Sequence, residues 1–127
     1  MGMQEEDDPL SRAVIGAAIT VHKALGPGLL ESAYQHCLAL ELSALGVRHQ
    51  VEVTVPIQYR GTTIEAAYRI DMLVDDRLIV EVKSIEKLLP VHEAQLLTYL
   101  RLTGKPVGLL LNFHTPYLRE GIKRLVL

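Results

Sequence analysis

The 127-residue chain contains one cysteine, no tryptophan and one phenylalanine, and it has no excess of basic residues. The lone Cys37 excludes an internal disulfide and a multi-cysteine zinc cluster, and this usage is typical of the reducing cytoplasm. No apolar run reaches the ~18 residues of a membrane-spanning helix. The acidic segment from Met1 to Asp8 is unlike a secretory signal or a transit peptide. We therefore expect a cytoplasmic protein without a membrane segment.

The charge balance counts against broad, nonspecific adhesion to nucleic acid. Lys and Arg number 13 against 15 Asp and Glu, so the formal net charge is −2, whereas such adhesion neutralises many phosphates. The aromatic residues also give few stacking platforms, apart from five tyrosines. Any contact with nucleic acid must therefore come from a local cluster of residues or through a bound cation.

Length and a 49% apolar composition fit a single domain over residues 1–127, in which residues 1–8 form a flexible acidic tail. Helical periodicity predicts a helix from Pro9 to Leu25, with Asp8 as its N-cap, and a second helix from about Leu29 to Leu45. The segment Gly26-Pro27-Gly28 separates the two helices by a tight turn.

The apolar pattern then changes to period two, which predicts strands over 51–59, 64–74 and 78–84. Pro56 indicates an edge or a local irregularity in the first strand. A helix over 91–103, a buried strand over 107–112 and a final strand over 122–127 follow. This order, helix-helix-β-β-β-helix-β with an extra C-terminal strand, predicts an α/β fold with a mixed sheet.

The loop between the second and third strands sets their register. A two-residue loop of Asp75 and Asp76 would pair polar with apolar residues at every position. A three-residue loop that includes Arg77 gives one entirely apolar face, with the pairs Val74–Leu78, Met72–Val80 and Ile70–Val82. A slip of one residue would turn a whole strand over, so burial favours this register. The other face then pairs Leu73 with Ile79, Asp71 with Glu81 and Arg69 with Lys83.

Asp71 and Glu81 are thus expected directly opposite each other, with Cβ atoms about 4.5–5.5 Å apart. Carboxylates at this distance repel, unless one is protonated, a base lies between them or a cation binds both. Lys83 lies two residues after Glu81 on the same face of its strand. Two carboxylates offer hard oxygen ligands, which suit Mg²⁺ or Mn²⁺ better than zinc.

Three short motifs lie on these elements. Asp71 is followed ten residues later by Glu81-Val82-Lys83 on the adjacent strand, Gly28-Leu29-Leu30-Glu31-Ser32-Ala33-Tyr34 opens the second helix, and Gln95-Leu96-Leu97-Thr98-Tyr99 lies on the third. The first resembles the core motif of the PD-(D/E)XK nuclease superfamily, although Ile70 rather than a proline precedes Asp71. The second is similar to the signature of its small GxxExxY branch, and the third resembles the Gln-x-x-x-Tyr motif of RecB-like nucleases.

The resemblance implies a restriction-endonuclease-like core and a divalent-metal-dependent nuclease acting on DNA or RNA. It implies that Mg²⁺ or Mn²⁺ is held by Asp71, Glu81, the main-chain carbonyl of Val82 and Glu31. Lys83 would orient or activate the attacking water. Gln95 and Tyr99, four residues apart on one helical face, would position water and phosphate, and Tyr34 would contact the substrate.

Each of these residues also has a simpler interpretation, which the sequence leaves open. Asp71, Glu81 and Lys83 could form a solvated sheet face with a salt bridge. Glu31 could favour the helix start through the macrodipole, and Tyr34 could be a packed tyrosine with a bonded hydroxyl. At the level of function, the alternative is a noncatalytic nucleic-acid-binding or protein-interaction module that retains the fold. The sequence also leaves open whether the core alone or a homodimer recognises the substrate.

Overall fold

The computed structural model describes residues 8–127, so the acidic tail expected over residues 1–7 lies outside the described residues. The elements are α1 (Pro9–Leu25), α2 (Glu31–Ala44), β1 (His49–Tyr59), β2 (Thr62–Val74), β3 (Leu78–Lys83), α3 (Pro90–Thr103), β4 (Val107–Asn112), the short 3-10 helix η2 (Leu118–Gly121) and β5 (Ile122–Val126). The predicted order of helices and strands is confirmed, and η2 is the element that the sequence pattern did not indicate.

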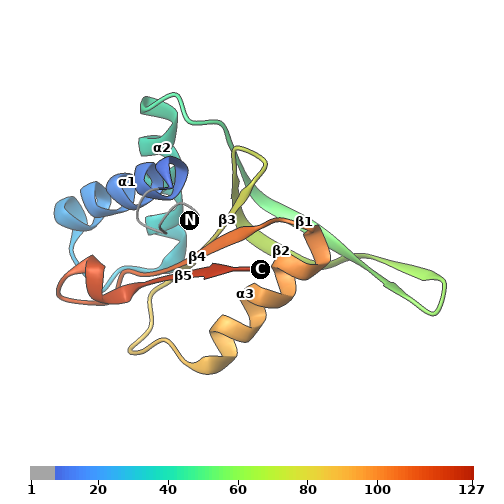
Figure 1. Cartoon of the computed structure of the whole chain (residues 1–127). Helices are drawn as coiled ribbons and strands as arrows, with labels where there is room; N and C mark the ends of the chain where they lie inside the picture. Colours follow the sequence, from blue (N-terminus) through green and yellow to red (C-terminus); the bar gives the residue numbers. More distant parts are fainter. Residues whose placement is uncertain (1–7) are drawn as a thin grey trace, which may run out of the picture.

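The five strands form one mixed sheet in the order β1-β2-β3-β4-β5 (Figure 1). The β3–β4 pair is parallel because α3 crosses over between them, and the other neighbouring pairs are antiparallel. One face of the sheet packs against α1 and α2, and α3 packs against the other face. The central strands β3 and β4 are therefore covered on both sides, which explains why their sequences are nearly continuous apolar runs.

The predicted register of β2 and β3 is confirmed at Met72–Val80, Leu73–Ile79 and Val74–Leu78. The expectation that the apolar face continues through Ile70 and Val82 was wrong. Ile70 belongs to the apolar cluster beneath α3, whereas Val82 belongs to the cluster beneath α1 and α2. The reason is that the regular ladder stops after Met72–Val80 and the two strands diverge beyond it. This divergence occurs at Asp71 and Glu81.

Beyond the sheet, β1 and β2 continue as a two-stranded arm (residues 56–67) that reaches away from the body of the molecule (Figure 1). Val55 and Tyr68, which are register partners, form its base. The register shifts between Val55 and Ile57, which confirms the irregularity predicted from Pro56. All residues of the arm are exposed or partly exposed.

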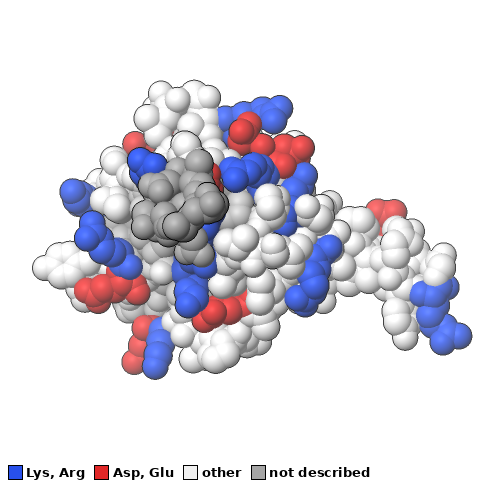
Figure 2. Space-filling view, in the orientation of Figure 1, with Lys and Arg blue, Asp and Glu red and all other residues white. Residues whose placement is uncertain are grey.

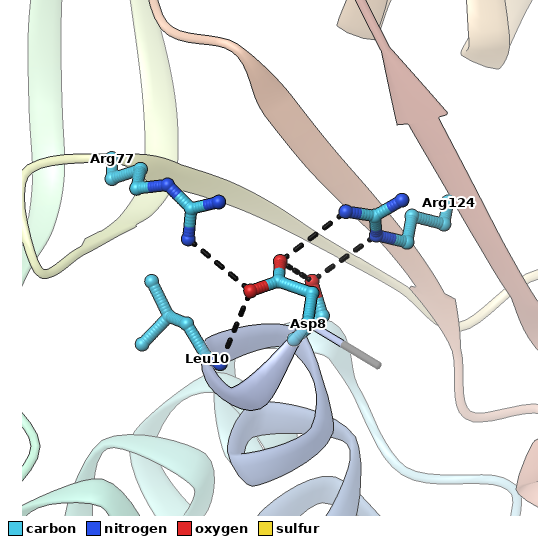
Figure 3. A network of polar contacts seen from close by, with 5 residues as sticks. Asp8, Leu10, Arg77 and Arg124 are labelled. Carbon is cyan, nitrogen blue, oxygen red and sulfur yellow. Dashed lines mark hydrogen bonds and ion pairs between the residues drawn. The ribbon is translucent and has the colours of Figure 1, made fainter. Parts of the chain in front are cut away.

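Asp8 is the N-cap of α1, as predicted, but it is buried rather than part of a flexible tail. Its carboxylate accepts hydrogen bonds from the Leu10 N–H, the Ser11 hydroxyl and the guanidinium groups of Arg77 and Arg124 (Figure 3). Burial opposes ionisation, but the bonds from Ser11 and the two arginines outweigh it and lower the pKa of Asp8 to about 2. One carboxylate thus ties α1 to the β2–β3 turn and to β5.

Replacing Asp8 with Asn is expected to destabilise the fold by about 2 kcal/mol near neutral pH, which is the free energy that corresponds to the lowered pKa of Asp8. Asn keeps the N-cap bond, so the variant isolates the charge. The stabilisation is present above pH 3.8 and disappears as the pH falls towards about 2. Urea unfolding between pH 2 and 7 measures both effects.

The matched control for this prediction is Asp75→Asn, because the Asp75 carboxylate forms an exposed ion pair with Arg48, at 3.4 Å. Such pairs contribute less than about 1 kcal/mol. Equal losses of stability in the two variants would contradict the role assigned to Asp8.

Candidate functional site

The candidate site lies where β2 and β3 part. The N–H of Asp71 donates to Oε2 of Glu81, and the N–H of Val82 donates to Oδ2 of Asp71, both at 2.8 Å. Each carboxylate therefore uses one oxygen to replace a missing bond of the ladder. The second oxygens, Oδ1 of Asp71 and Oε1 of Glu81, receive no hydrogen bond from residues 8–127. The predicted ladder pairs Asp71–Glu81 and Arg69–Lys83 do not form, because the ladder ends at Met72–Val80. Asp71 and Glu81 are instead brought together by these side-chain bonds to the backbone.

Burial and mutual repulsion make this pair of carboxyl groups hold a proton. Glu81 is 5% exposed, and burial together with the charge of Asp71 raises its pKa to about 8, against the opposing effects of the Asp71 N–H and Lys83. Burial also raises the pKa of Asp71, although the Val82 N–H and Lys83 oppose it. At neutral pH Glu81 is therefore mostly protonated, and a bound cation would replace that proton.

Glu31 reaches the same region from the first turn of α2. Its carboxylate accepts the N–H of Ser84 at 3.2 Å, just after Lys83 at the end of β3. Burial is the main cause of the raised pKa values of Asp71 and Glu81, and the charge of Glu31 adds to them. Among residues 8–127, however, no three acidic, histidine or cysteine side chains lie close enough to hold a metal ion. Glu31 thus lies at the edge of the site.

Tyr34, in the same helix, is completely buried. Its hydroxyl donates to the carbonyl of Gly26 and accepts the N–H of Leu29 at 3.1 Å, which holds the turn between α1 and α2. Its ring stacks on Phe113 with centroids 4.4 Å apart. A side chain without exposed surface cannot touch a substrate unless the turn opens, so the structure favours the packed interpretation of Tyr34 over direct contact.

The helix α3 brings Tyr99 to the carboxylates. Tyr99 is 4% exposed, and burial followed by the charge of Glu81 raises its pKa, so the hydroxyl remains a proton donor. Gln95 lies one turn earlier on the same helical face and is exposed to solvent. Leu96 and Leu100 anchor the helix on the sheet from the neighbouring positions.

Asn112, which no motif indicated, organises the segment after Lys83. It lies opposite Lys83 in the parallel register of β3 and β4 and is buried. Its Oδ1 accepts the N–H of Ile85 at 3.1 Å, and its Nδ2 donates to the carbonyl of Ile85 at 2.9 Å. The available sequence signal is that a polar residue ends an otherwise apolar buried strand, because buried amides are kept where they form hydrogen bonds.

The remaining contacts around the candidate site involve Tyr68 and Ser84. The Tyr68 ring, at the base of the arm, lies 5.6 Å from the Tyr99 ring, centroid to centroid. The Ser84 hydroxyl donates to the carbonyl of Leu29, so the turn before α2 is fixed to the end of β3. Neither residue belongs to a motif, and only the fold brings them to the site.

The mixed five-stranded sheet, with two helices on one face and one on the other, is consistent with a restriction-endonuclease-like fold. A family model described as the PD-(D/E)XK nuclease superfamily matches residues 8–125. Because this match spans nearly the whole chain, the protein belongs to that superfamily. Comparison with curated proteins and with solved structures gave no match. Within residues 8–127, no helix combines the length and apolar character that crossing a membrane requires.

Proposed function

We propose that this protein is a divalent-metal-dependent nuclease that hydrolyses phosphodiester bonds in DNA or RNA. The observation that carries the proposal is the pair Asp71 and Glu81, which is joined through backbone N–H groups where β2 and β3 part and interacts with Lys83. Glu81 is buried and Asp71 is partly buried. A carboxyl pair with raised pKa values, of which one member is buried, is costly for the fold, and such groups gather at functional sites. Membership of a nuclease superfamily supports the same conclusion.

The residues present fit Mg²⁺ or Mn²⁺. Asp71 Oδ1 and Glu81 Oε1 would supply two carboxylate oxygens, and the carbonyl of Val82 would supply a third ligand. Mg²⁺ keeps several waters and needs only one or two carboxylates, so Glu31 is not required in direct contact and would act through water. When bound, such a cation polarises a phosphoryl oxygen and lowers the pKa of a coordinated water.

Lys83 and two residues of α3 would orient the attacking water and the phosphate. The Lys83 ammonium interacts with both carboxylates and is only partly exposed, so it would orient the attacking water and balance charge that develops on the phosphate. Tyr99 would donate a hydrogen bond from the wall of the site. Gln95, one turn away and open to solvent, would bind the incoming phosphate or its water.

The same proposal assigns the chain to the GxxExxY branch of the superfamily. What supports this is that its three defining residues act together. Gly28 adopts φ +102°, which is unfavourable for other residues. Tyr34 holds the turn that contains Gly28, and Glu31 bonds the strand end beside Lys83. Together these residues hold the α1–α2 turn in place beside the candidate site.

Cleavage of labelled single- and double-stranded DNA and RNA, with Mg²⁺ or Mn²⁺, tests the proposal. Lys83→Ala is expected to lower the cleavage rate by about 10²–10³-fold, because it removes a charge that stabilises the transition state. Lys23→Ala, at the exposed end of α1, is the matched control and should cleave normally. If the parent cleaves nothing, or Lys83→Ala cleaves as fast as the parent, the catalytic proposal fails. Binding of nucleic acid without cleavage would favour the noncatalytic alternative.

A further inference from the structure

The arm emerges directly from the candidate site. Asp71 and the arm are carried by the same strand, β2, and Tyr68 at the base of the arm lies three positions before Asp71. The Tyr68 ring also contacts the Tyr99 ring, which in turn lies beside Glu81. A phosphate bound through a cation at the two carboxylates would therefore have the base of the arm next to it.

Most of the exposed aromatic surface of the molecule lies on this arm and at its base. Of the five tyrosines, Tyr34 and Tyr99 are buried, and Phe113 is buried as well. The exposed tyrosines are Tyr68 at the base, Tyr59 at the tip and Tyr117 beside η2. The chain therefore places two of its three exposed aromatic rings along one path that starts at the site.

A single strand of moderate length can reach from the site to both rings. At about 3.3 Å per residue, Tyr68 lies roughly 10 Å along the strand from Asp71. Tyr59 lies four residues beyond Val55, the register partner of Tyr68, which adds roughly 13 Å. With a rise of about 3.4 Å per nucleotide in a stacked strand, the two rings fall roughly three and seven nucleotides from the carboxylates.

The arm has few positive charges that could attract an anionic strand. Arg60, the one basic residue of the arm, occupies the exposed turn at its tip, where basic surface is visible in Figure 2. Near the base, Arg69 forms a loose ion pair with Glu52, at 3.9 Å, and both side chains are exposed. Glu65, also on the arm, carries a negative charge, which lowers the net positive charge of this region. Binding here would thus depend on stacking, with a few phosphate contacts, rather than on a basic surface.

We propose that the arm holds a single-stranded segment of the nucleic-acid substrate, with one base stacked on Tyr68 and a later base stacked on Tyr59. This inference rests on the proposed nuclease function, since the strand must leave the site along β2. Unpaired bases are required because the rings of a duplex are stacked on one another and cannot pack against a tyrosine. Arg60 and Arg69 contact phosphates of the same strand.

The test is fluorescence anisotropy of labelled single strands of 4 and 12 nucleotides with the full chain and Ca²⁺ in place of Mg²⁺, so that a cation can link the carboxylates to the phosphate; a gel of each sample checks that the strands stay intact. Tyr59→Ser is expected to weaken binding of the 12-mer by about tenfold and to leave the 4-mer unchanged, since a short strand does not reach the tip. Tyr59→Phe should bind like the parent because it keeps the ring. Tyr117→Ser is the matched control, since Tyr117 is 71% exposed against 65% for Tyr59 but lies off the path, and it should change nothing.

The contact between Arg60 and a phosphate is tested separately, through the salt dependence of binding. Arg60→Gln is expected to reduce the slope of log affinity against log salt by about 0.7, the value for one phosphate on a single strand. An unchanged slope would remove Arg60 from the proposal, and an unchanged 12-mer affinity in Tyr59→Ser would overturn the proposal itself.

Failure of this inference is distinguishable from failure of the proposed function. If the parent and Tyr59→Ser both cleave nucleic acid with equal KM, the arm does not bind the substrate but the nuclease assignment stands. If the parent neither binds nor cleaves, both fail. If Tyr59→Ser converts a dimer to a monomer in sedimentation while 12-mer binding is unchanged, the arm contacts a second copy of the chain and the proposal is overturned.

Discussion

Replacing Glu81 with Gln is expected to lower nuclease activity by more than about 100-fold and to remove stabilisation by Mg²⁺ or Mn²⁺. Even residues that only support metal ligands contribute 10- to 100-fold, and Glu81 would be a ligand itself. The change is small in shape, because the amide oxygen can still accept the Asp71 N–H that Glu81 now accepts at 2.8 Å. Cleavage rates and melting temperatures with and without millimolar metal give the two readouts.

Glu120→Gln is the control for this prediction, because Glu120 is exposed on η2. It should keep both the activity and the metal-dependent rise in melting temperature. An active Glu81→Gln protein would exclude Glu81 as a metal ligand. If the metal effect persisted while activity was lost, Glu81 would act on the substrate rather than on the cation.

The stability of the metal-free protein is expected to fall by several kcal/mol as the pH rises from about 4.5 to about 8. Burial and the charge of Asp71 raise the pKa of Glu81 from 4.5 to about 8, so the folded state binds more protons than the unfolded state within this interval. Stability then decreases with pH there and levels off above it. This sign is opposite to that of Asp8, whose contribution is lost only towards acid.

Urea unfolding at a series of pH values checks this prediction. Glu81→Gln should flatten the profile and exceed the parent in stability at pH 8, because a neutral amide cannot repel Asp71. Adding Mg²⁺ should restore the parent at pH 8 and release a proton on binding at pH 7, which calorimetry in buffers of different ionisation enthalpy detects. A metal-free profile that rises between pH 5 and 8 would contradict the buried, repelling pair.

The order of the elements was predictable because local forces set it. Asp8-Pro9 starts α1 through a cap and a fixed φ, and the change from helical to two-residue periodicity marks the start of the meander. The register of β2 and β3 was also predictable, because a slip would have exposed the apolar residues of a whole strand. Pro56 likewise predicted the irregularity that appears as a register shift between Val55 and Ile57.

Some features of the candidate site were also predictable from the sequence, and others were not. That Asp71 and Glu81 lie near each other could be predicted from the register of the preceding pairs Met72–Val80 and Leu73–Ile79. Their hydrogen bonds to the backbone could not be predicted, because these form only where β2 leaves β3, and Ile70 then packs on the other side of the sheet. Neither Asn112 nor Tyr68 belonged to a motif, since their partners lie far away in sequence or on another element.

By itself, the sequence determined the α/β order, the β2–β3 register and the meeting of an acid pair with a lysine, because periodicity, caps and the burial of apolar residues act over a few neighbours. Only the tertiary structure decided that Tyr34 is sealed in the core, that Asp8 joins three elements and that the hairpin leaves the body as an arm. These features depend on packing between distant segments, and the free energy of such packing is set by the whole fold rather than by any local pattern.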